Sequence, residues 1–454
     1  MKDQGKSRGR AERRTDPARK PKEQHFSDPA RRPKAQHSAG PEHKRKERSS
    51  AGPERRPEPE KKPETFAEFY FRKTAGRLPG YAEELRIKQT GLNAFWETHG
   101  LPGKAPEIIP SPRGRNYRTT SKRKAVRVNG RFGFSMGYRE KPKDGILPDG
   151  AELEAELHGR IYAAALEILR KPHYQPLADA LNFFIIRGSY RSAAAILNVF
   201  HLSGDVVRKA KSFAEELREA EPGTAGVSLY FDESRSEYYF ESFRPRTPVS
   251  FKKLSGASLL DLALPGRPKL LYPLSVFSQV NESMLPVFTD SAFEMLQLTD
   301  RTRFIDLYCG YGLFALYGAA QAHSVIGIDF ESASVKAARA NAEHLHPGRD
   351  IRFEAAPVTA DTLEDLLPPP DPEHVPETIL LDPPRNGTAD GVIAAIAARR
   401  PEKVLAVYCG IEQMAKEWRL WRANGFEPAE ARCFDMFPGS PNLETMLLLK
   451  RASA

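Results

Sequence analysis

The residues best suited to chemistry lie in a fixed order near the end of the chain. Asp382 ends one predicted strand and precedes two prolines and Arg385, Cys409 ends the next strand, and Glu444 opens a later one. A cysteine just before a helix can be a nucleophile, because the helix N-terminus stabilises its thiolate. A glutamate at the mouth of a buried strand can remove a proton if burial raises its pKa. The set therefore predicts a nucleophile and a base at neighbouring strand ends.

Each of these residues also has a purely structural interpretation. Cys409 could be a small core cysteine, which is the role we expect for Cys309 and Cys433. Glu444 could be a surface carboxylate that caps its strand, and the turn after Asp382 could be an ordinary strand end. Burial and mutual position in the folded chain separate these alternatives.

A glycine turn marks a second candidate site. The segment Asp306–Phe314 places Gly310 and Gly312 between a predicted strand and a helix, where glycine permits a tight turn and close approach to a ligand. Asp329 ends the following strand, where an acidic side chain can accept both hydroxyls of a ribose. Its alternative role is an N-cap for the next helix. The pattern suits S-adenosylmethionine as well as a nicotinamide dinucleotide, although it lacks the full dinucleotide fingerprint.

Strand and helix patterns alternate from residue 251 to residue 454. This alternation favours an α/β fold with an open, mostly parallel sheet, helices on both faces, and ligands beyond the carboxyl ends of the strands. The predicted strands are Arg303–Tyr308, Ser324–Asp329, Asp350–Ala355, Thr378–Asp382, Lys403–Tyr408, Pro428–Met436 and Glu444–Lys450, and the predicted helices are Leu313–Gln321, Ser332–His344, Ala389–Ala398 and Ile411–Ala423.

Residues 65–250 are predicted to form a central α+β domain. Asn129-Gly130 between two short apolar runs is a strong hairpin signal. A basic stretch over residues 111–124 leads into this hairpin and could bind phosphates. An equally simple alternative is a solvated face. The candidate RNA-binding residues here are Arg113, Arg115, Arg118, Lys122 and Arg123.

The first 64 residues differ in composition from the rest. They carry 20 Lys and Arg against 11 Asp and Glu, whereas the remainder carries 49 against 48. They also contain nine prolines and one aromatic residue, Phe26, too little apolar surface to offset the entropy of ordering. We expect a disordered basic tail that attracts a nucleic acid. The alternatives are a solubilising tail and an arm for an acidic protein.

Composition limits the remaining possibilities. The chain contains no apolar run of about 18 residues, so no transmembrane helix is predicted. Its N-terminus lacks the apolar region of a signal peptide. Three cysteines form neither a disulfide framework nor a metal-binding set, so we expect a reducing cytoplasmic location and no metal.

Taken in order, these motifs resemble the RNA 5-methyluridine methyltransferase family, the uracil-C5 enzymes of tRNA and 23S rRNA. The similarity covers residues 105–451 approximately. Five matching segments carry it: Phe277–Asn281, Asp306–Phe314, Asp382–Arg385, the strand and helix around Cys409, and Asp435–Thr445.

The resemblance implies a Rossmann-like class I S-adenosylmethionine-dependent methyltransferase. The Cys409 thiolate would add to C6 of a uracil, C5 would take the methyl group, and Glu444 would remove the C5 proton. The substrate would be structured RNA with its target base flipped out, and Arg385 would contact it. The implied enzyme is a monomer without an iron–sulfur cluster, since only three cysteines exist, and without an N-terminal β-barrel. The implied cofactor-binding residues are Gln279, Tyr308, Gly310, Gly312, Asp329 and Asp382.

The chain departs from the family pattern at three neighbours of the catalytic pair. Gly410 and Ile411 replace the usual Asn-Pro after the nucleophile, and Asn442 stands two residues before the base, where relatives often have histidine. Two other functions therefore stay open. One is methylation of a different base position, such as an exocyclic amine, which needs no cysteine. The other is an RNA-binding or folding factor on an inactive methyltransferase scaffold.

Overall fold

A computed structural model describes residues 64–75, 77–135, 151–235, 249–371 and 373–452. Residues 62–454 form one compact unit. Residues 1–63 of the predicted disordered tail lie outside the described residues, as does Glu237–Phe243, for which the sequence also predicts a strand, so both stay predictions.

The larger of the two main sheets has eight strands in the order β1-β15-β16-β14-β13-β10-β11-β12. All seven strands predicted after residue 300 are present, with ends that differ by at most two residues. The strand bounds are β1 Ile108–Ile109, β10 Arg303–Leu307, β11 Ser324–Asp329, β12 Ile351–Ala355, β13 Glu377–Leu381, β14 Lys403–Tyr408, β15 Phe426–Phe434 and β16 Glu444–Arg451.

The strand order reverses at β10. Parallel pairing runs from β10 to β11 and β12 on one side, and to β13 and β14 on the other. β16 is antiparallel to both β14 and β15. A crevice at the carboxyl ends of β10 and β13 is where a sheet of this kind binds ligands.

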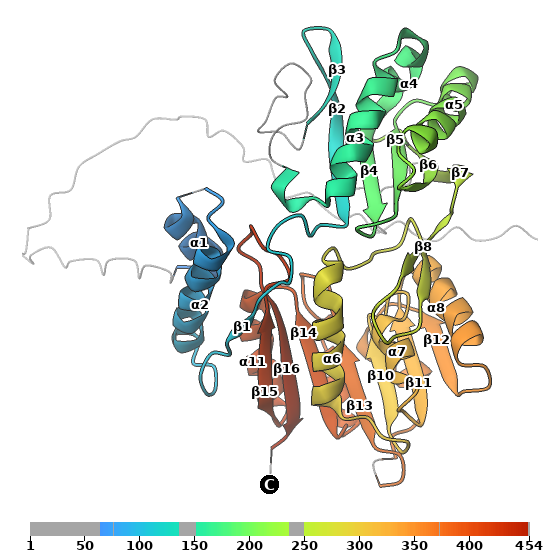
Figure 1. Cartoon of the computed structure of the whole chain (residues 1–454). Coiled ribbons are helices and arrows are strands. Elements are labelled where there is room, and N and C mark those ends of the chain that lie inside the picture. The colour runs from blue at the N-terminus through green and yellow to red at the C-terminus, as the bar shows by residue number, and fades with distance from the viewer. Residues whose placement is uncertain (1–63, 76, 136–150, 236–248, 372, 453–454) are drawn as a thin grey trace, which may run out of the picture. The chain divides into compact units, whose positions relative to one another are not determined.

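Helices cover both faces of this sheet, which explains why its strands are almost continuously apolar. Phe304 and Leu405 pack with α6, α7 and α8, whereas Ile305 and Val404 pack with α2, α9, α10 and α11. Figure 1 shows α6 and α11 on opposite faces. The helix bounds are α1 Phe66–Thr74, α2 Tyr81–Thr98, α6 Leu285–Leu296, α7 Leu313–Gly318, α8 Ser332–Leu345, α9 Ala360–Leu366, α10 Val392–Ala398 and α11 Ile411–Ala423.

The second main sheet has six strands in the order β3-β2-β4-β5-β6-β7. The predicted Asn129-Gly130 turn is confirmed, with positive φ angles of 50° and 78°. Helices α3, α4 and α5 pack on one face of the sheet. The bounds are β2 Thr120–Val128, β3 Arg131–Ser135, α3 Glu156–Leu169, α4 Gln175–Ala180, β4 Leu181–Gly188, β5 Ala193–Val199, α5 Gly204–Ala220, β6 Thr224–Asp232 and β7 Val249–Gly256; β8 Leu259–Leu262 and β9 Leu270–Pro273 form a separate pair.

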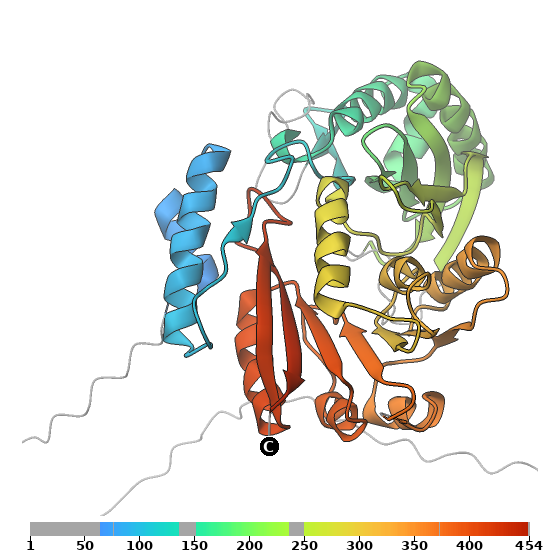
Figure 2. The same ribbon diagram turned by 60° about the horizontal axis from the view of Figure 1, so that its bottom comes forward.

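The pairing of the strands does not follow the predicted division of residues 65–250 from residues 251–454. β1 pairs with β15 in the large sheet, and α1 and α2 pack into the same core as α11. Figure 2 shows α1 and α2 beside β1. At the other end, β7 begins at Val249 and pairs with β6 of the second sheet. Residues 66–109 therefore belong structurally to the C-terminal sheet: β1 adds a strand to its edge, and α1 and α2 pack against its core.

No described helix combines the length and apolar character needed to cross a bilayer. In the same described ranges, no group of three or more histidine, cysteine, aspartate or glutamate side chains is placed to hold a metal ion.

Candidate active site

Cys409 and Glu444 lie opposite one another at the ends of adjacent strands. Tyr408 of β14 pairs with Thr445 of β16, so the next position along β14 meets the preceding position on β16. Cys409 is partly exposed, whereas Cys309 and Cys433 are buried, which fits the predicted difference between a reactive and two core thiols. Glu444 is only 1% exposed, so the alternative of a surface carboxylate is wrong.

The surroundings of Glu444 favour its neutral form. Burial raises the pKa of this carboxyl well above its usual range, the nearby Asp382 raises it further, and Arg385 opposes both effects. Its Oε2 atom has no hydrogen-bond partner among the described residues. Once ionised, a carboxylate with a raised pKa binds a proton more tightly than an exposed carboxylate, as a general base requires.

The expected activation of Cys409 by the helix N-terminus is outweighed in the free protein. Burial raises the pKa of the thiol to about 11, and Glu444 and Asp382 raise it as well, whereas Arg385 lowers it. Gly410 is the N-cap of α11 and contributes no side chain to the cap. Burial, together with the two nearby carboxyl groups, therefore outweighs the helix, and the thiol form predominates at neutral pH.

Asp382 leaves β13 beside the glycine turn. Its N–H donates to the carbonyl of Leu307 at 3.2 Å, which continues the pairing between β13 and β10 by one residue. Burial raises the pKa of Asp382 to about 7, and Asp329 contributes to the same direction. Asp382 thus interacts electrostatically both with Asp329, beside the glycine turn, and with the pair Cys409 and Glu444.

The glycine turn is held by hydrogen bonds from its backbone to the last two residues of β11, Ile328 and Asp329. The N–H of Gly310 donates to Asp329 Oδ2 at 2.9 Å, and Asp329 Oδ1 accepts from the N–H of Glu331 at 2.8 Å. The φ angles are 64° at Tyr308, 54° at Gly310 and 90° at Gly312, in the region that favours glycine. Glu331, not Asp329, is the N-cap of α8, so the N-cap alternative for Asp329 is wrong.

These residues fit an adenosyl methyl donor. A Cβ at Gly310 would meet nothing within 4 Å, so the turn faces open space. Asp306 is buried, and while its Oδ2 accepts from Ala315, its Oδ1 has no partner among the described residues. Asp329 would meet a ribose. Burial raises the pKa of Asp306 well above its usual range, so its neutral carboxyl group can form hydrogen bonds to a ligand, and Asp382 gains negative charge as a cationic ligand favours its ionised form.

The side chains of two other predicted cofactor-binding residues, Gln279 and Tyr308, lie in surroundings that differ from those of the glycine turn. Gln279 lies in a partly exposed loop, which Arg187 holds by donating to Leu274 O at 2.6 Å and to Ser278 Oγ at 3.2 Å. The ring of Tyr308 packs against the core on the α10 and α11 side of the sheet. Tyr308 therefore shapes the turn by its backbone, with its side chain directed elsewhere.

Comparison with known proteins supports the same assignment. No family model matches the chain. A protein from Alkalilimnicola ehrlichii described as 23S rRNA (uracil(1939)-C(5))-methyltransferase RlmD is 33% identical over 381 residues, 81% of this chain and 78% of the relative. The chain belongs to the RNA uracil-C5 methyltransferase family. This result confirms the resemblance that the motifs predicted.

A more distant relative and a solved structure are also similar to the chain. An uncharacterized RNA methyltransferase from Geobacter sulfurreducens is 26% identical over 81% of this chain and 73% of the relative. The crystal structure of the Pyrococcus abyssi tRNA (uracil-54, C5)-methyltransferase with S-adenosyl-L-homocysteine matches with a TM-score of 0.59 at 18% identity, over 82% of this chain and 83% of that one. This last likeness confirms the fold, a Rossmann-like methyltransferase sheet.

Three of the basic residues expected to meet RNA in this family member have at least part of their side chains near the surface. Arg113 is exposed, with its guanidinium 4.0 Å from the centre of the Tyr190 ring. Arg118 and Lys122 are partly buried, and Lys122 lies 5.0 Å from the centre of the Phe183 ring. Their contact with RNA stays a prediction.

Two other residues of that basic set have structural partners. Arg123 is fully buried and pairs with Glu154 at 2.5 Å, so the prediction that it contacts phosphates is wrong. Alternation along β2 is the reason, because it turns every second side chain into the core. Arg115 is partly buried and donates to Glu84 at 3.0 Å and to Pro79 O at 2.5 Å. Its predicted role in RNA binding competes with these bonds.

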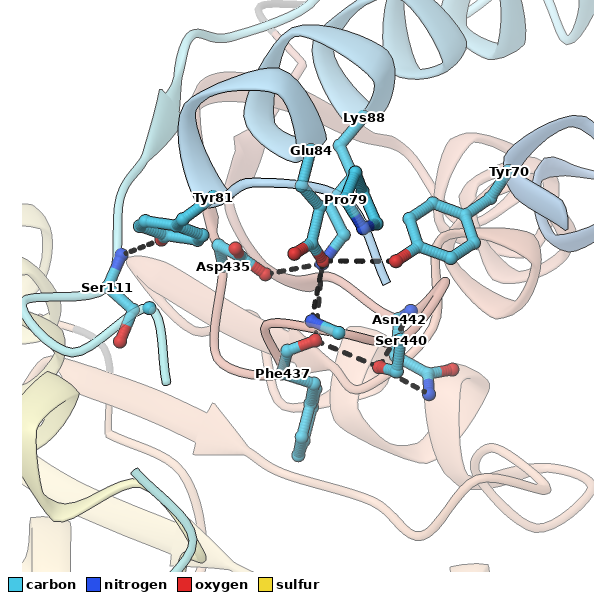
Figure 3. A network of polar contacts seen from close by, with 12 residues as sticks. Tyr70, Pro79, Tyr81, Glu84, Lys88, Ser111, Asp435, Phe437, Ser440 and Asn442 are labelled. Carbon is cyan, nitrogen blue, oxygen red and sulfur yellow. Dashed lines mark hydrogen bonds and ion pairs between the residues drawn. The ribbon is translucent and has the colours of Figure 1, made fainter. Parts of the chain in front are cut away.

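The sequence alone did not indicate a buried polar network between α2 and the residues that follow β15. Figure 3 shows Lys88 and Glu84 of α2 reaching Asp435 and its neighbours. The lysine and Asp435 are both fully buried. The Glu84–Lys88 spacing of four residues was a signal, but it is shared by most solvated helix surfaces.

Proposed function

We propose that this protein methylates C5 of a uridine in structured RNA, with S-adenosylmethionine as the methyl donor, through a covalent adduct at Cys409. The observation that carries the proposal is the convergence of a partly exposed thiol and a buried carboxyl group at paired strand ends, next to the glycine turn. A thiol nucleophile is needed for a ring carbon that is too weakly nucleophilic to take the methyl group unaided, because addition of the thiolate to the ring makes that carbon electron-rich.

Cys409 and Glu444 divide the chemistry between them. The thiolate adds its electron pair to C6 of uracil, which breaks the C5–C6 π bond and places negative charge on C5 and O4. C5 takes the methyl group from the donor sulfonium, with release of neutral S-adenosylhomocysteine. Glu444 accepts the C5 proton, the electrons of that C–H bond restore the double bond, and the C6–S bond breaks to regenerate the thiolate.

The remaining groups position these reactants. Gly310, Gly312 and Asp329 would hold the donor, together with Gln279 and Asp382. Arg385 is exposed and lowers the pKa of both Cys409 and Glu444. It can therefore stabilise the thiolate and the ionised base while it contacts the RNA.

The basic tail and the exposed Arg113 support RNA as the partner. We also propose that the enzyme works as a cytoplasmic monomer, because every site residue comes from one chain and its free thiols suit a reducing compartment. With only three cysteines, and Cys409 needed as the nucleophile, too few thiols remain for an iron–sulfur cluster.

Transfer of a labelled methyl group from S-adenosylmethionine to transcripts of 23S rRNA and tRNA tests the proposal. Cys409→Ala should abolish methylation, Glu444→Gln should accumulate an RNA–protein adduct that survives denaturation, and Cys433→Ala should behave like the wild type. Nuclease digestion and mass spectrometry of the product should give 5-methyluridine. Methylation retained by Cys409→Ala would favour the exocyclic-amine alternative, and RNA binding without any donor binding would favour the inactive scaffold.

A further inference from the structure

The connection between β15 and β16, residues Asp435–Leu443, delivers the catalytic base and is here called the base loop. Phe434 pairs with Glu444 as the last rung before the chain turns away. The position of the Glu444 carboxylate therefore depends on how these nine residues are held. The N–H of Asp435 still donates to the carbonyl of Ile109 in β1 at 3.0 Å, but β15 and β16 have already separated from one another.

Lys88 of α2 binds the first half of the base loop by an ion pair and a hydrogen bond. Its Nζ lies 2.7 Å from Asp435 Oδ1 and 3.2 Å from the carbonyl oxygen of Phe437. The side chain is completely buried, as is that of Asp435. A buried ammonium group is costly unless it is paired and hydrogen-bonded, so this arrangement is specified by the fold.

Glu84, one helical turn before Lys88, binds the tip of the base loop by a hydrogen bond. Its Oε1 accepts from the N–H of Gly439 at 2.6 Å and lies 3.0 Å from Lys88 Nζ. Gly439 has a φ of 78°, and a Cβ there would lie 2.7 Å from Leu153 Cδ2. The tip is therefore confined by a hydrogen bond on one side and by packing on the other.

The network holds equal numbers of positive and negative side chains. Glu84 and Asp435 contribute two negative charges, and Lys88 and Arg115 contribute two positive ones. Tyr70 of α1 donates to Glu84 at 3.2 Å, which brings the first helix into the same network. Figure 3 shows Tyr70 of α1 and Glu84 and Lys88 of α2 directed toward the base loop.

We propose that Lys88 and Glu84 are positioning residues that set the Glu444 carboxylate against the C5 proton by holding the base loop. The inference rests on the proposed function, because it assigns a consequence to the last step of that reaction. Proton removal needs the carboxylate within hydrogen-bonding reach of C5, whereas addition of Cys409 and methyl transfer do not. Loosening the base loop should therefore slow the final step and spare the earlier ones.

Lys88→Met in the full chain tests this role with the transcript that the wild type methylates. We expect kcat to fall about 10- to 100-fold while KM for RNA changes less than about twofold. A denaturation-resistant RNA adduct that already carries the labelled methyl group should accumulate during turnover. The double variant Lys88→Met/Asp435→Asn removes both charges of the buried ion pair. Because it leaves no unpaired buried charge, it should fold even where Lys88→Met alone does not. It should accumulate the same adduct.

Arg399→Met is the matched control. It breaks another buried ion pair, in which Arg399 Nε lies 2.9 Å from Glu377 Oε2 at the opposite end of β13. A positioning role predicts lower stability in this control with wild-type kcat and no adduct. An equal loss of kcat in the control, or a folded Lys88 variant without adduct, would overturn the role. If Glu444→Gln also forms no adduct, the proposed function fails and the role with it, whereas an adduct in Glu444→Gln alone rejects only the role.

Discussion

At the scale of single residues, the proposed nucleophile Cys409 is a protonated thiol in the free protein. Burial and two neighbouring carboxyl groups raise the pKa of Cys409, and only Arg385 acts in the opposite direction. The thiol is consequently protected from adventitious oxidants and alkylating agents while no substrate is bound. Ionisation requires a change in the surroundings, such as a cationic donor beside Asp382 or an electron-poor ring above the sulfur.

The pH dependence of Cys409 alkylation in the free protein checks this state. Because the thiol pKa of about 11 lies above the accessible range, the thiolate fraction should rise about tenfold per pH unit between pH 7.5 and 9.5. Iodoacetamide labelling followed by mass spectrometry of the Cys409 peptide measures the rate.

Arg385→Gln should slow this alkylation at any one pH, since Arg385 lowers the pKa of Cys409. Cys409→Ser provides the background, because Cys309 and Cys433 are buried. A labelling rate that levels off below pH 9 would show that the thiolate is already formed.

At the scale of secondary structure, the sequence predicted what local patterns encode. The strands around the site were found because they are apolar runs bounded by turn residues. Helices α3 and α6 and the short strand β1 were not predicted. The two residues of β1 become a strand only because β15, more than 300 positions later, offers a free edge. Cys409 and Glu444 could be named from the motifs, but their pairing across β14 and β16 required the register.

The glycine turn allows its two glycines to be separated by experiment. Gly310→Ala should cost about 1 kcal/mol of stability for its left-handed backbone but weaken S-adenosylhomocysteine binding about tenfold, because its open side faces the donor. Gly312→Ala should cost about 2 to 4 kcal/mol, since its Cβ would also lie 2.8 Å from Leu316 Cδ1.

Thermal or urea unfolding and calorimetric titration give both quantities. Gly348→Ala is the control, because Gly348 has a φ of 79° with nothing within 4 Å and lies away from the turn. If Gly310→Ala binds S-adenosylhomocysteine as tightly as Gly348→Ala does, Gly310 does not line the donor site.

At the scale of the whole molecule, the excess positive charge is concentrated in the N-terminal part of the sequence. Residues 1–64 hold nearly all of the excess positive charge, and residues 62–454 form the compact unit. Local sequence predicted this separation of charge. It could not predict that residues 66–109 serve the C-terminal sheet, because that fact lies in contacts such as Lys88 with Asp435, 347 positions apart.

Deletion of residues 1–64 should flatten the salt dependence of RNA binding. Each phosphate contact that is lost removes about 0.7 to 0.9 from the slope of log K against log salt, so several contacts should change it by about 2 or more. Filter binding between 50 and 300 mM salt, at roughly the ionic strengths where such slopes are measured, gives the value. A tail of equal length with its Lys and Arg replaced by Gln should match the deletion; an unchanged slope would exclude the tail from binding.

The tether between α2 and the base loop also bears on the order in which the protein gains activity. Contacts between residues 347 positions apart form slowly, since the intervening chain must first be brought together at a cost in entropy. The glycine turn and Asp329, by contrast, are only 19 positions apart. A folding chain can thus acquire its donor pocket early and still lack a placed base. Maturation of the enzyme ends when the first helices close over the last hairpin.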